Sequence, residues 1–340
     1  MVALGRRPPV SIRDPLIKSV SWALGSCPRG EVFQQCKTLI HCANAPYSPQ
    51  CPNADELNIE GSKRLFETAR KNGIDQIIFL SSLSAQPHIR SHYAKSKLMV
   101  EGFLDKDRDV ILRLGLVLGP GGIAKKIQTL LSKTRVVPLM DGGCQPVWII
   151  HVEDLCGVVV SLLRKKRYGM LQVGHSQRLS MAELNRSLAK SLRRRVYFFT
   201  IPFWLLYPLL KLTEQMSIKL PFTTENILGL RGARCLNLDS DMEKIGFHVR
   251  SLDALLESGV IEEWIPKQNY SKLGFLDILR PCEKDLLKYS LRETDWKQFN
   301  RFQPLNNGPV VGFLILAGIG LVGVTISPVR AVIRLLKGDG

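Results

Sequence analysis

The sequence predicts an α/β fold whose core is a doubly wound, mostly parallel sheet. Short apolar segments alternate with helical stretches between residues 38 and 163, an order typical of strand–helix–strand units. The chain has 340 residues, which suffices for one large domain with its own core and an appendage. We therefore expect the sheet domain over residues 1–164 and a smaller lobe over residues 165–260.

The clearest strand is the apolar run from Gln76 to Leu80, which ends in Ser81 and Ser82. The run is short and follows the turn signal Asn72-Gly73, so it predicts a buried strand. The stretch from Tyr93 to about residue 104 carries apolar residues at 98, 100, 103 and 104. This spacing predicts a helix directly after the strand.

Three polar side chains of this strand and helix predict a proton-transfer site. Tyr93 and Lys97 are four residues apart and therefore share one face of the predicted helix. A free tyrosine has a pKa near 10, and a nearby cation lowers that pKa. A serine hydroxyl at the strand end, Ser82 or Ser81, can hold a substrate oxygen while the tyrosine exchanges its proton. Tyr207 and Lys211 repeat the spacing, but no strand-borne serine precedes them.

Further motifs in the same order give the chain a family resemblance. They are Leu39-Ile-His-Cys-Ala43, Asn58-Ile-Glu-Gly61, Tyr93-Ala-Lys-Ser-Lys97, the segment from Arg113 to Gly122, and His151-Val-Glu-Asp154. Together they resemble the NAD-dependent epimerase/dehydratase family of extended short-chain dehydrogenase/reductases, which includes UDP-glucose 4-epimerase. The resemblance covers roughly residues 1 to 260. It implies a Rossmann-type sheet over residues 1–164 that binds NAD or NADP, and a substrate lobe over residues 165–260.

The resemblance also implies roles for individual residues. Tyr93 would be the catalytic acid and base, Lys97 would support it and bind the nicotinamide ribose, and Ser82 rather than Ser81 would hold the reacting oxygen. Ala43 would end the strand that passes beneath the cofactor. Arg6 stands where a basic residue after the second strand can meet the 2′-phosphate of NADP.

The beginning of the chain departs from the family pattern. Members open with a strand and a Gly-x-x-Gly-x-x-Gly turn, whose backbone amides hold the cofactor pyrophosphate. Here the first glycine is Gly5, and Gly25 and Gly30 do not have that spacing. Residues 1–6 instead resemble the end of the family's second strand. Either the missing strand lies upstream, or the phosphate half of the cofactor site is lost.

The charge of the chain points to anionic partners. The formal net charge is +17, and basic clusters occur at residues 125–126, 164–167 and 193–195. No zinc-finger spacing or RNA-binding aromatic motif accompanies this charge, so nucleic acid is not an expected partner. Nucleotide-sugar phosphates and anionic lipid headgroups are better candidates, and a homodimer is left open.

The eight cysteines predict neither a metal site nor a disulfide framework. They form no Cys-x-x-Cys pair and have no zinc-ligand spacing with the six histidines. A reducing compartment therefore fits the chain. Cys42 and Cys156 lie in apolar runs and are expected to be packed thiols.

Two apolar segments suggest contact with a membrane. Residues 309–329 are 21 residues without a charge, long enough to cross a hydrocarbon core. We expect an anchor over residues 309–335, a juxtamembrane stretch over 261–308, and the main domain on the cytoplasmic side; the alternative is a buried core helix. The aromatic-rich segment 196–210 is too short to span, and either packs in the core or rests in the membrane interface.

The sequence therefore leaves three functions open. The first is an NAD(P)-dependent nucleotide-sugar epimerase or dehydratase. The second is a non-catalytic protein that keeps the fold as a binding or assembly module at a membrane, which the missing glycine turn favours. The third is a reductase of a lipid or steroid-like substrate.

Overall fold

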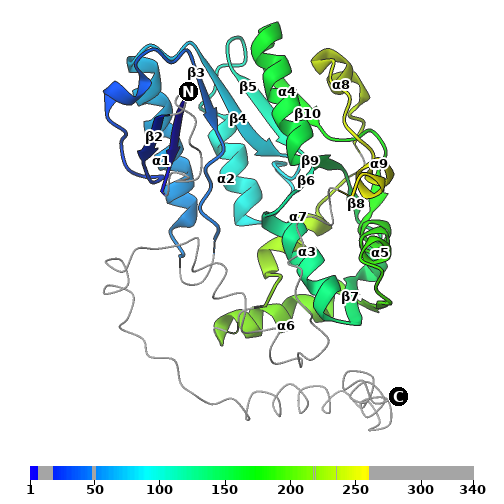
Figure 1. Cartoon of the computed structure of the whole chain (residues 1–340). Coiled ribbons are helices and arrows are strands. Elements are labelled where there is room, and N and C mark those ends of the chain that lie inside the picture. The colour runs from blue at the N-terminus through cyan, green and yellow to red at the C-terminus, as the bar shows by residue number, and fades with distance from the viewer. Residues whose placement is uncertain (7–17, 48–50, 217, 219, 235, 260–340) are drawn as a thin grey trace, which may run out of the picture.

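A computed structural model describes residues 1–6, 18–47, 51–216, 218, 220–234 and 236–259. Its main sheet has four parallel strands in the order β10-β5-β4-β3 (Figure 1). These strands are β3 (Thr38–His41), β4 (Gln76–Ser82), β5 (Val110–Leu114) and β10 (Gly169–Val173). The predicted parallel α/β fold is confirmed.

Helices cover both faces of this sheet because β4 alternates its side chains between two apolar layers. Ile77 and Phe79 pack against α1 and α2, whereas Ile78 packs against α4 and α8. The helices are α1 (Ala54–Lys71), α2 (His92–Glu101), α4 (Val152–Lys165) and α8 (Asp239–Ile245). The sheet is therefore doubly wound, as predicted, and the run from Gln76 to Leu80 is a fully buried strand.

The motif Asn58-x-x-Gly61 on α1 fixes the loops at the ends of two strands. The Asn58 side chain accepts a hydrogen bond from the Ala45 backbone N–H (2.7 Å) and donates one to the Ala45 carbonyl (2.8 Å). A Cβ atom at Gly61 would lie 2.8 Å from the backbone nitrogen of Gly25. Glycine is required at position 61 because the loop around Gly25 packs directly on the helix.

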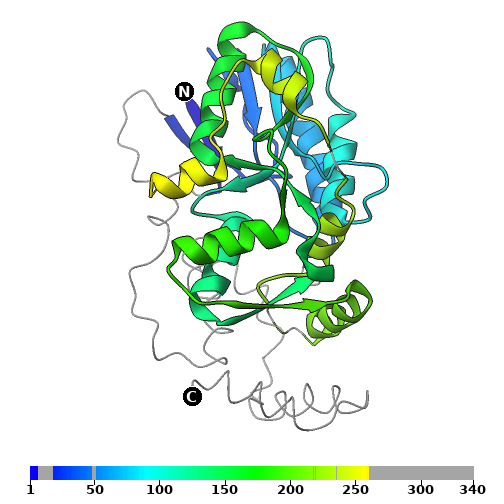
Figure 2. The ribbon, with the colours of Figure 1, turned by 90° about the vertical axis from the view of Figure 1, so that its right-hand side faces the viewer.

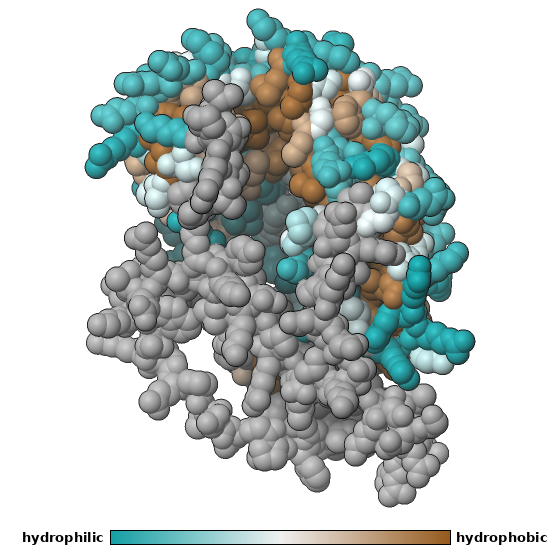
Figure 3. All heavy atoms as spheres, viewed as in Figure 1, coloured by the Kyte–Doolittle hydropathy of each residue, from teal (hydrophilic) through white to brown (hydrophobic). Residues whose placement is uncertain are grey.

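The N-terminal strands form a separate parallel pair, β1 (Val2–Gly5) and β2 (Lys18–Ser21). Leu4 and Trp22 of this region share the apolar core of α1 and β4, yet neither strand pairs with β3. Within the described residues β3 is thus the edge of the main sheet, and its Ile40 is exposed. The face seen in Figure 3 carries apolar atoms between polar ones over its upper part.

A second body of the protein lies beyond the carboxyl end of the sheet (Figure 2). Its core joins α3, α5 and α9 with β7 and β9. Its elements are β6 (Leu116–Leu118), α3 (Gly122–Lys133), β7 (Val136–Met140), β8 (Pro146–Val147), β9 (Ile149–His151), β11 (Leu179–Ser180), α5 (Met181–Ser191), β12 (Tyr197–Ile201), α6 (Phe203–Gln215), α7 (Thr224–Arg231) and α9 (Leu252–Glu257). Two short 3-10 helices cover Gly30–Phe33 and Asp141–Gly143.

The elements do not divide between the two bodies at residue 164. β10 follows that residue but pairs with β5 in the main sheet, whereas β7 precedes it and pairs with β12. The antiparallel pair β8–β11 likewise joins segments from before and after it, whereas both strands of the parallel pair β6–β9 precede it. The second body therefore draws on residues 116–151 as well as on the predicted lobe.

Membrane contact is tested by the structure only in part. The predicted anchor and juxtamembrane stretch, residues 261–335, lie outside the described residues. Within the described ranges, no helix combines the length and the hydrophobicity needed to cross a membrane. The apolar segment 196–210 divides between β12 and α6, and Pro208 lies inside the helix.

The prediction that Cys42 and Cys156 are packed thiols is wrong, because both side chains are exposed. Cys42 follows the last residue of edge strand β3, and Cys156 lies on the outer side of α4, whose buried residues include Leu155 and Val158. The other described cysteines, 27, 36, 51 and 144, are also free.

Candidate active site

The predicted helix after β4 is α2, and a cap sets its start. The Ser91 hydroxyl is fully buried and accepts a hydrogen bond from the Ala94 backbone N–H at 3.1 Å. Such a side chain satisfies one of the free N–H groups at a helix start. The helix consequently begins at His92, which places Tyr93 in its first turn, beside the end of β4.

Lys97 lies one turn further along α2 and is almost wholly buried, with 5% of its surface exposed. Its Nζ donates a hydrogen bond to the Leu80 carbonyl at 2.8 Å. The same Nζ lies 4.6 Å from the Phe79 ring centroid and 5.8 Å from the Tyr93 ring centroid. The predicted shared face of Tyr93 and Lys97 is therefore present.

The two serines at the end of β4 have different partners. Ser81 is buried and its hydroxyl donates to Glu101 Oε1 at 2.5 Å. Ser82 instead hydrogen-bonds Tyr93 and lies 2.8 Å from the Ser84 hydroxyl, Oγ to Oγ. Ser82 rather than Ser81 is thus the serine that meets the tyrosine, and the role inferred for it stays a prediction.

Burial sets the protonation of both titratable groups. It raises the pKa of Tyr93, while the hydrogen bond with Ser82 lowers that pKa. Burial also lowers the pKa of the Lys97 ammonium, which falls to about 8. The Tyr93 side chain still has 39% of its surface exposed, so the loss of solvent that raises the pKa concerns its hydroxyl end. Tyr93 therefore holds its proton at neutral pH. The expectation that the lysine lowers the tyrosine pKa stays a prediction.

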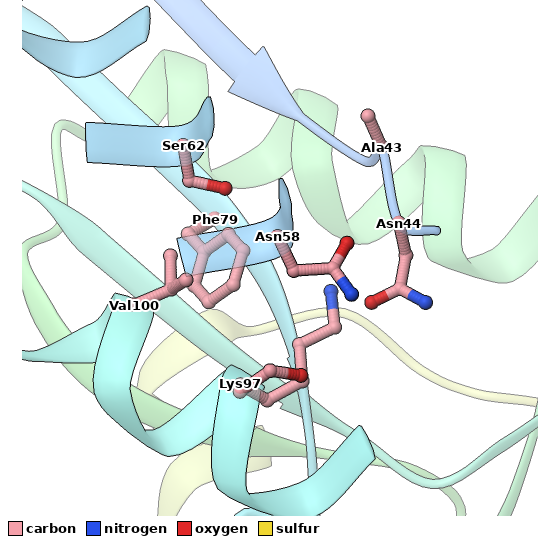
Figure 4. Close-up of a pocket in the computed structure, with 8 residues that line it drawn as sticks. Ala43, Asn44, Asn58, Ser62, Phe79, Lys97 and Val100 are labelled. Atoms are coloured by element: carbon pink, nitrogen blue, oxygen red, sulfur yellow. The ribbon is translucent and has the colours of Figure 1, made fainter. Parts of the chain in front are cut away.

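The Lys97 ammonium points into a cleft beside the loop that follows β3 (Figure 4). The cleft has about 170 Å³ of space and is lined by Ala43, Asn44, Asn58, Ser62, Phe79, Ser96, Lys97 and Val100. Almost none of this space can hold a water-sized sphere, so the cleft would have to widen before a ligand could enter it. Ala43 thus faces Lys97 across the cleft, while Asn44 is a lining residue that the sequence analysis did not identify.

His41, at the end of β3, supports the cleft from beneath. Its ring stacks on Phe79 and meets Phe66 edge-on, with centroids 5.5 and 5.3 Å apart. Its Nε2 lies 2.9 Å from the Ser62 hydroxyl. Burial lowers the pKa of His41 to about 3. The imidazole is therefore neutral across the physiological range and packs rather than transfers protons.

A polar cluster beside Tyr93 was not foreseen from the sequence. His92 contacts the Asp55 carboxylate through its Nδ1 and stacks on the Tyr47 ring, with centroids 3.8 Å apart. Glu225 of α7 accepts a hydrogen bond from the Tyr93 backbone N–H at 3.3 Å. Burial raises the pKa of Glu225, which favours the protonated form of this carboxyl. It ties the second body to the start of α2.

The described residues could hold only one end of a dinucleotide. Lys97, Tyr93 and the loop at Ala43 form the end expected to meet a nicotinamide ribose. No described residue forms a glycine-rich phosphate cradle, and Asp55 and Glu56 occupy the first turn of α1, which disfavours an anion there. Arg6 is exposed directly after β1, and its predicted contact with a 2′-phosphate stays a prediction.

We predict that Lys97 titrates near pH 8 in the folded protein. Its pKa in the unfolded chain is near 10.5, so the unfolded state binds more protons between these values, and the stability contributed by this group rises as pH increases from about 8 to about 10.5. An NMR titration of 13C-labelled lysine side chains measures this directly. The resonance that titrates near pH 8 should be absent from Lys97→Arg; a Lys97 resonance titrating above pH 10 would contradict the assignment.

The part of the chain that contains this site matches a known family model. Residues 29–174 match the model of the NAD dependent epimerase/dehydratase family. This segment contains the cleft, the end of β4 and the first turns of α2. A comparison with curated proteins gives no match.

Solved structures of nucleotide-sugar enzymes share the fold. An NAD-dependent NDP-hexosamine 5,6-dehydratase involved in tunicamycin biosynthesis is 15% identical, with a TM-score of 0.58, over 80% of this chain and 91% of the other. UDP-glucuronic acid 4-epimerase from Bacillus cereus, in complex with UDP-glucuronic acid and NAD, is 15% identical, with a TM-score of 0.55, over 74% and 84%. The dTDP-glucose 4,6-dehydratase from Streptomyces venezuelae is 17% identical, with a TM-score of 0.54, over 75% and 81%.

The motifs, the parallel sheet and the family match agree with one another. At these identities the solved structures establish the fold alone, whereas the family match covers the motifs themselves. The resemblance to the NAD-dependent epimerase/dehydratase family is therefore confirmed over residues 29–174.

Proposed function

We propose that the protein is an NAD(P)-dependent oxidoreductase of the nucleotide-sugar epimerase/dehydratase type. The observation that carries this proposal is the meeting of Ser82, Tyr93 and Lys97 where β4 ends and α2 begins. The family match over residues 29–174 supports the same reaction class. So do the structural relatives, some of which were solved with UDP-sugars and NAD.

In this proposal each side chain has a separate task. NAD or NADP would supply the hydride acceptor, with Lys97 and the loop at Ala43 holding its nicotinamide ribose. Ser82 would position a sugar hydroxyl, and Tyr93 would exchange a proton with that oxygen. Because the pKa of Tyr93 is raised in the described state, the phenol is ready to donate a proton. It must lose that proton before it can accept one from the sugar.

Turnover of nucleotide sugars tests the proposal. The full chain is incubated with NAD or NADP and a panel of UDP- and dTDP-sugars, and the products are identified by NMR. An epimerised, dehydrated or oxidised sugar is the expected result. If no sugar is converted although the protein binds the cofactor, the proposed substrate class is wrong.

A second candidate function is a non-catalytic binding or assembly module. It is favoured by the small cleft, by the raised pKa of Tyr93, and by the lack of a phosphate cradle among the described residues. Such a protein would fold without the cofactor and would convert no sugar. A reductase of a lipid or steroid-like substrate is the third candidate, which an apolar surface on α6 favours. The membrane anchor and the cytoplasmic placement stay predictions.

A further inference from the structure

Helix α6 in the second body is attached by one of its faces. Leu210 and Thr213 are buried on this face, and Leu210 packs against Met140 of β7 and Ile227 of α7. Phe203, Leu206 and Tyr207 are partly buried against the same cluster. This inner face is enough to hold α6 on the protein.

The opposite face of α6 is also apolar, and the described chain leaves it exposed. The exposed fractions are 72% for Trp204, 46% for Leu205, 42% for Leu209, 53% for Leu212 and 46% for Met216 just beyond the helix. Successive members of this set are one, four, three and four residues apart, a spacing that places them on a single stripe along the helix. We call these five residues the outer face of α6. A continuous exposed apolar patch of this kind usually marks a binding surface.

Basic and aromatic side chains accompany the outer face. Residues 193–216 contain four basic residues and one acidic residue. The acidic residue, Glu214, is engaged by the backbone N–H and the hydroxyl of Thr224. The Arg231 guanidinium lies 3.8 Å from the Phe203 ring centroid, at the start of α6. On β12, which leads into α6, Tyr197 and Phe199 are exposed as well.

We propose that the outer face of α6 docks on the surface of a bilayer that contains anionic lipids. The helix has 13 residues, too few to cross a hydrocarbon core, so it lies in the plane of the interface. Leucine and tryptophan side chains enter the acyl boundary, and the neighbouring arginines and lysine meet the headgroups. The net charge of +17 favours this partner, as does the uncharged run at residues 309–329.

The docking surface lies one helix away from the candidate active site. α6 packs on α7 through Leu210 and Ile227, and Glu225 at the start of α7 holds the backbone of Tyr93. The inference does not depend on the proposed reaction, because it concerns the outer face alone. A protein seated in this way keeps its cleft close to the membrane surface.

Depth-dependent quenching of Trp204 tests the proposal on the full chain. The protein is mixed with phosphatidylcholine/phosphatidylserine vesicles whose acyl chains carry bromine, and the fluorescence of wild type is compared with that of Trp204→Phe. The difference isolates Trp204 from the other tryptophans. We expect this component to be blue-shifted and quenched by the brominated lipid. Unquenched Trp204 on a vesicle-bound protein would overturn the proposal, because the protein would then be held elsewhere.

A pair of double variants provides the matched control. Leu205→Glu/Leu212→Glu places two charges on the outer face, and Met99→Glu/Val160→Glu places two at equally exposed positions on α2 and α4. Vesicle binding is measured by the quenching of Trp204. The first pair should weaken this binding at least about tenfold. The second should leave it unchanged. Equal behaviour of both pairs would contradict docking by α6.

A second copy of the chain, or another part of the same chain, could cover the outer face instead of lipid. Both alternatives can be tested without lipid. If a second copy covers it, size-exclusion chromatography with light scattering will show a dimer that Leu205→Glu/Leu212→Glu dissociates. If another part of the chain covers it, acrylamide will not quench Trp204 in solution. The proposal expects an accessible Trp204 and no such dimer, so either of these results would overturn it.

Discussion

Replacing Tyr93 by phenylalanine is expected to lower turnover about 10²- to 10⁴-fold, the usual contribution of a positioned acid or base. The substitution keeps the ring, which packs in the first turn of α2, and removes only the hydroxyl that hydrogen-bonds Ser82. Cofactor affinity should change little, since Lys97 and the loop at Ala43 remain. The measurement is kcat for the nucleotide sugar that the wild-type protein converts.

Tyr207→Phe is the matched control for this experiment. Tyr207 and Lys211 repeat the Tyr-x-x-x-Lys spacing on α6, but Tyr207 packs on Phe203, with ring centroids 5.5 Å apart, far along the chain from β4. Its hydroxyl has no part in the proposed reaction, so turnover should stay at the wild-type value. Full turnover in Tyr93→Phe would remove the tyrosine from the mechanism.

Replacing Arg113 by methionine should destabilise the protein by about 3–5 kcal/mol, because it leaves the buried Glu101 carboxylate without its cation. Arg113 on β5 binds Glu101 on α2 through two nitrogens, at 3.0 and 2.6 Å. The two side chains are only 11% and 7% exposed. The pair joins the helix that carries Tyr93 and Lys97 to the sheet. Urea unfolding monitored by circular dichroism measures the free energy of unfolding.

Two further variants separate the charge from the packing. Glu101→Leu/Arg113→Met removes both charges and should recover most of the lost stability, since an apolar pair of similar volume can replace a buried ion pair. Lys37→Met removes an exposed pair with Asp75, 3.6 Å apart, and should change stability by less than about 1 kcal/mol. If Arg113→Met unfolds like Lys37→Met, the ion pair does not anchor α2.

The features of the site that depend on local sequence patterns could be predicted. β4, the start of α2 and the shared face of Tyr93 and Lys97 follow from an apolar run, a turn signal and a four-residue spacing. The choice of Ser82 over Ser81 is consistent with the structure, in which Ser81 turns to Glu101 and Ser82 to Tyr93. Each of these features depends on contacts between neighbours in the chain or between adjacent elements.

Other features of the site depend on contacts between distant parts of the chain, which no local sequence pattern predicts. Glu225 reaches the Tyr93 backbone from 132 positions along the chain, and nothing around it in the sequence indicates that contact. The raised pKa of Tyr93 follows from desolvation of its hydroxyl, which spacing alone does not give. The segment 196–210 reads as one apolar run, whereas its pairing with β7 makes its first half a strand.

The phosphate half of the cofactor site decides between the candidate functions. Among the described residues, the end proposed to hold the nicotinamide lies at β3, β4 and α2, and no glycine-rich cradle accompanies it. An oxidoreductase needs the whole dinucleotide to bind, whereas an assembly module needs none. Cofactor affinity therefore separates the candidates before any substrate is known.

Titration of the full chain with NADH and NADPH is the most direct test of this account. We predict a saturable rise and blue shift of nicotinamide fluorescence, as the ring leaves water for the cleft beside Lys97. Lys97→Met should weaken this signal, and Lys211→Met, at the second Tyr-x-x-x-Lys match, should not. If millimolar cofactor leaves the fluorescence of the wild-type mixture equal to that of free cofactor, the site holds no nicotinamide and the proposed enzymatic function is wrong.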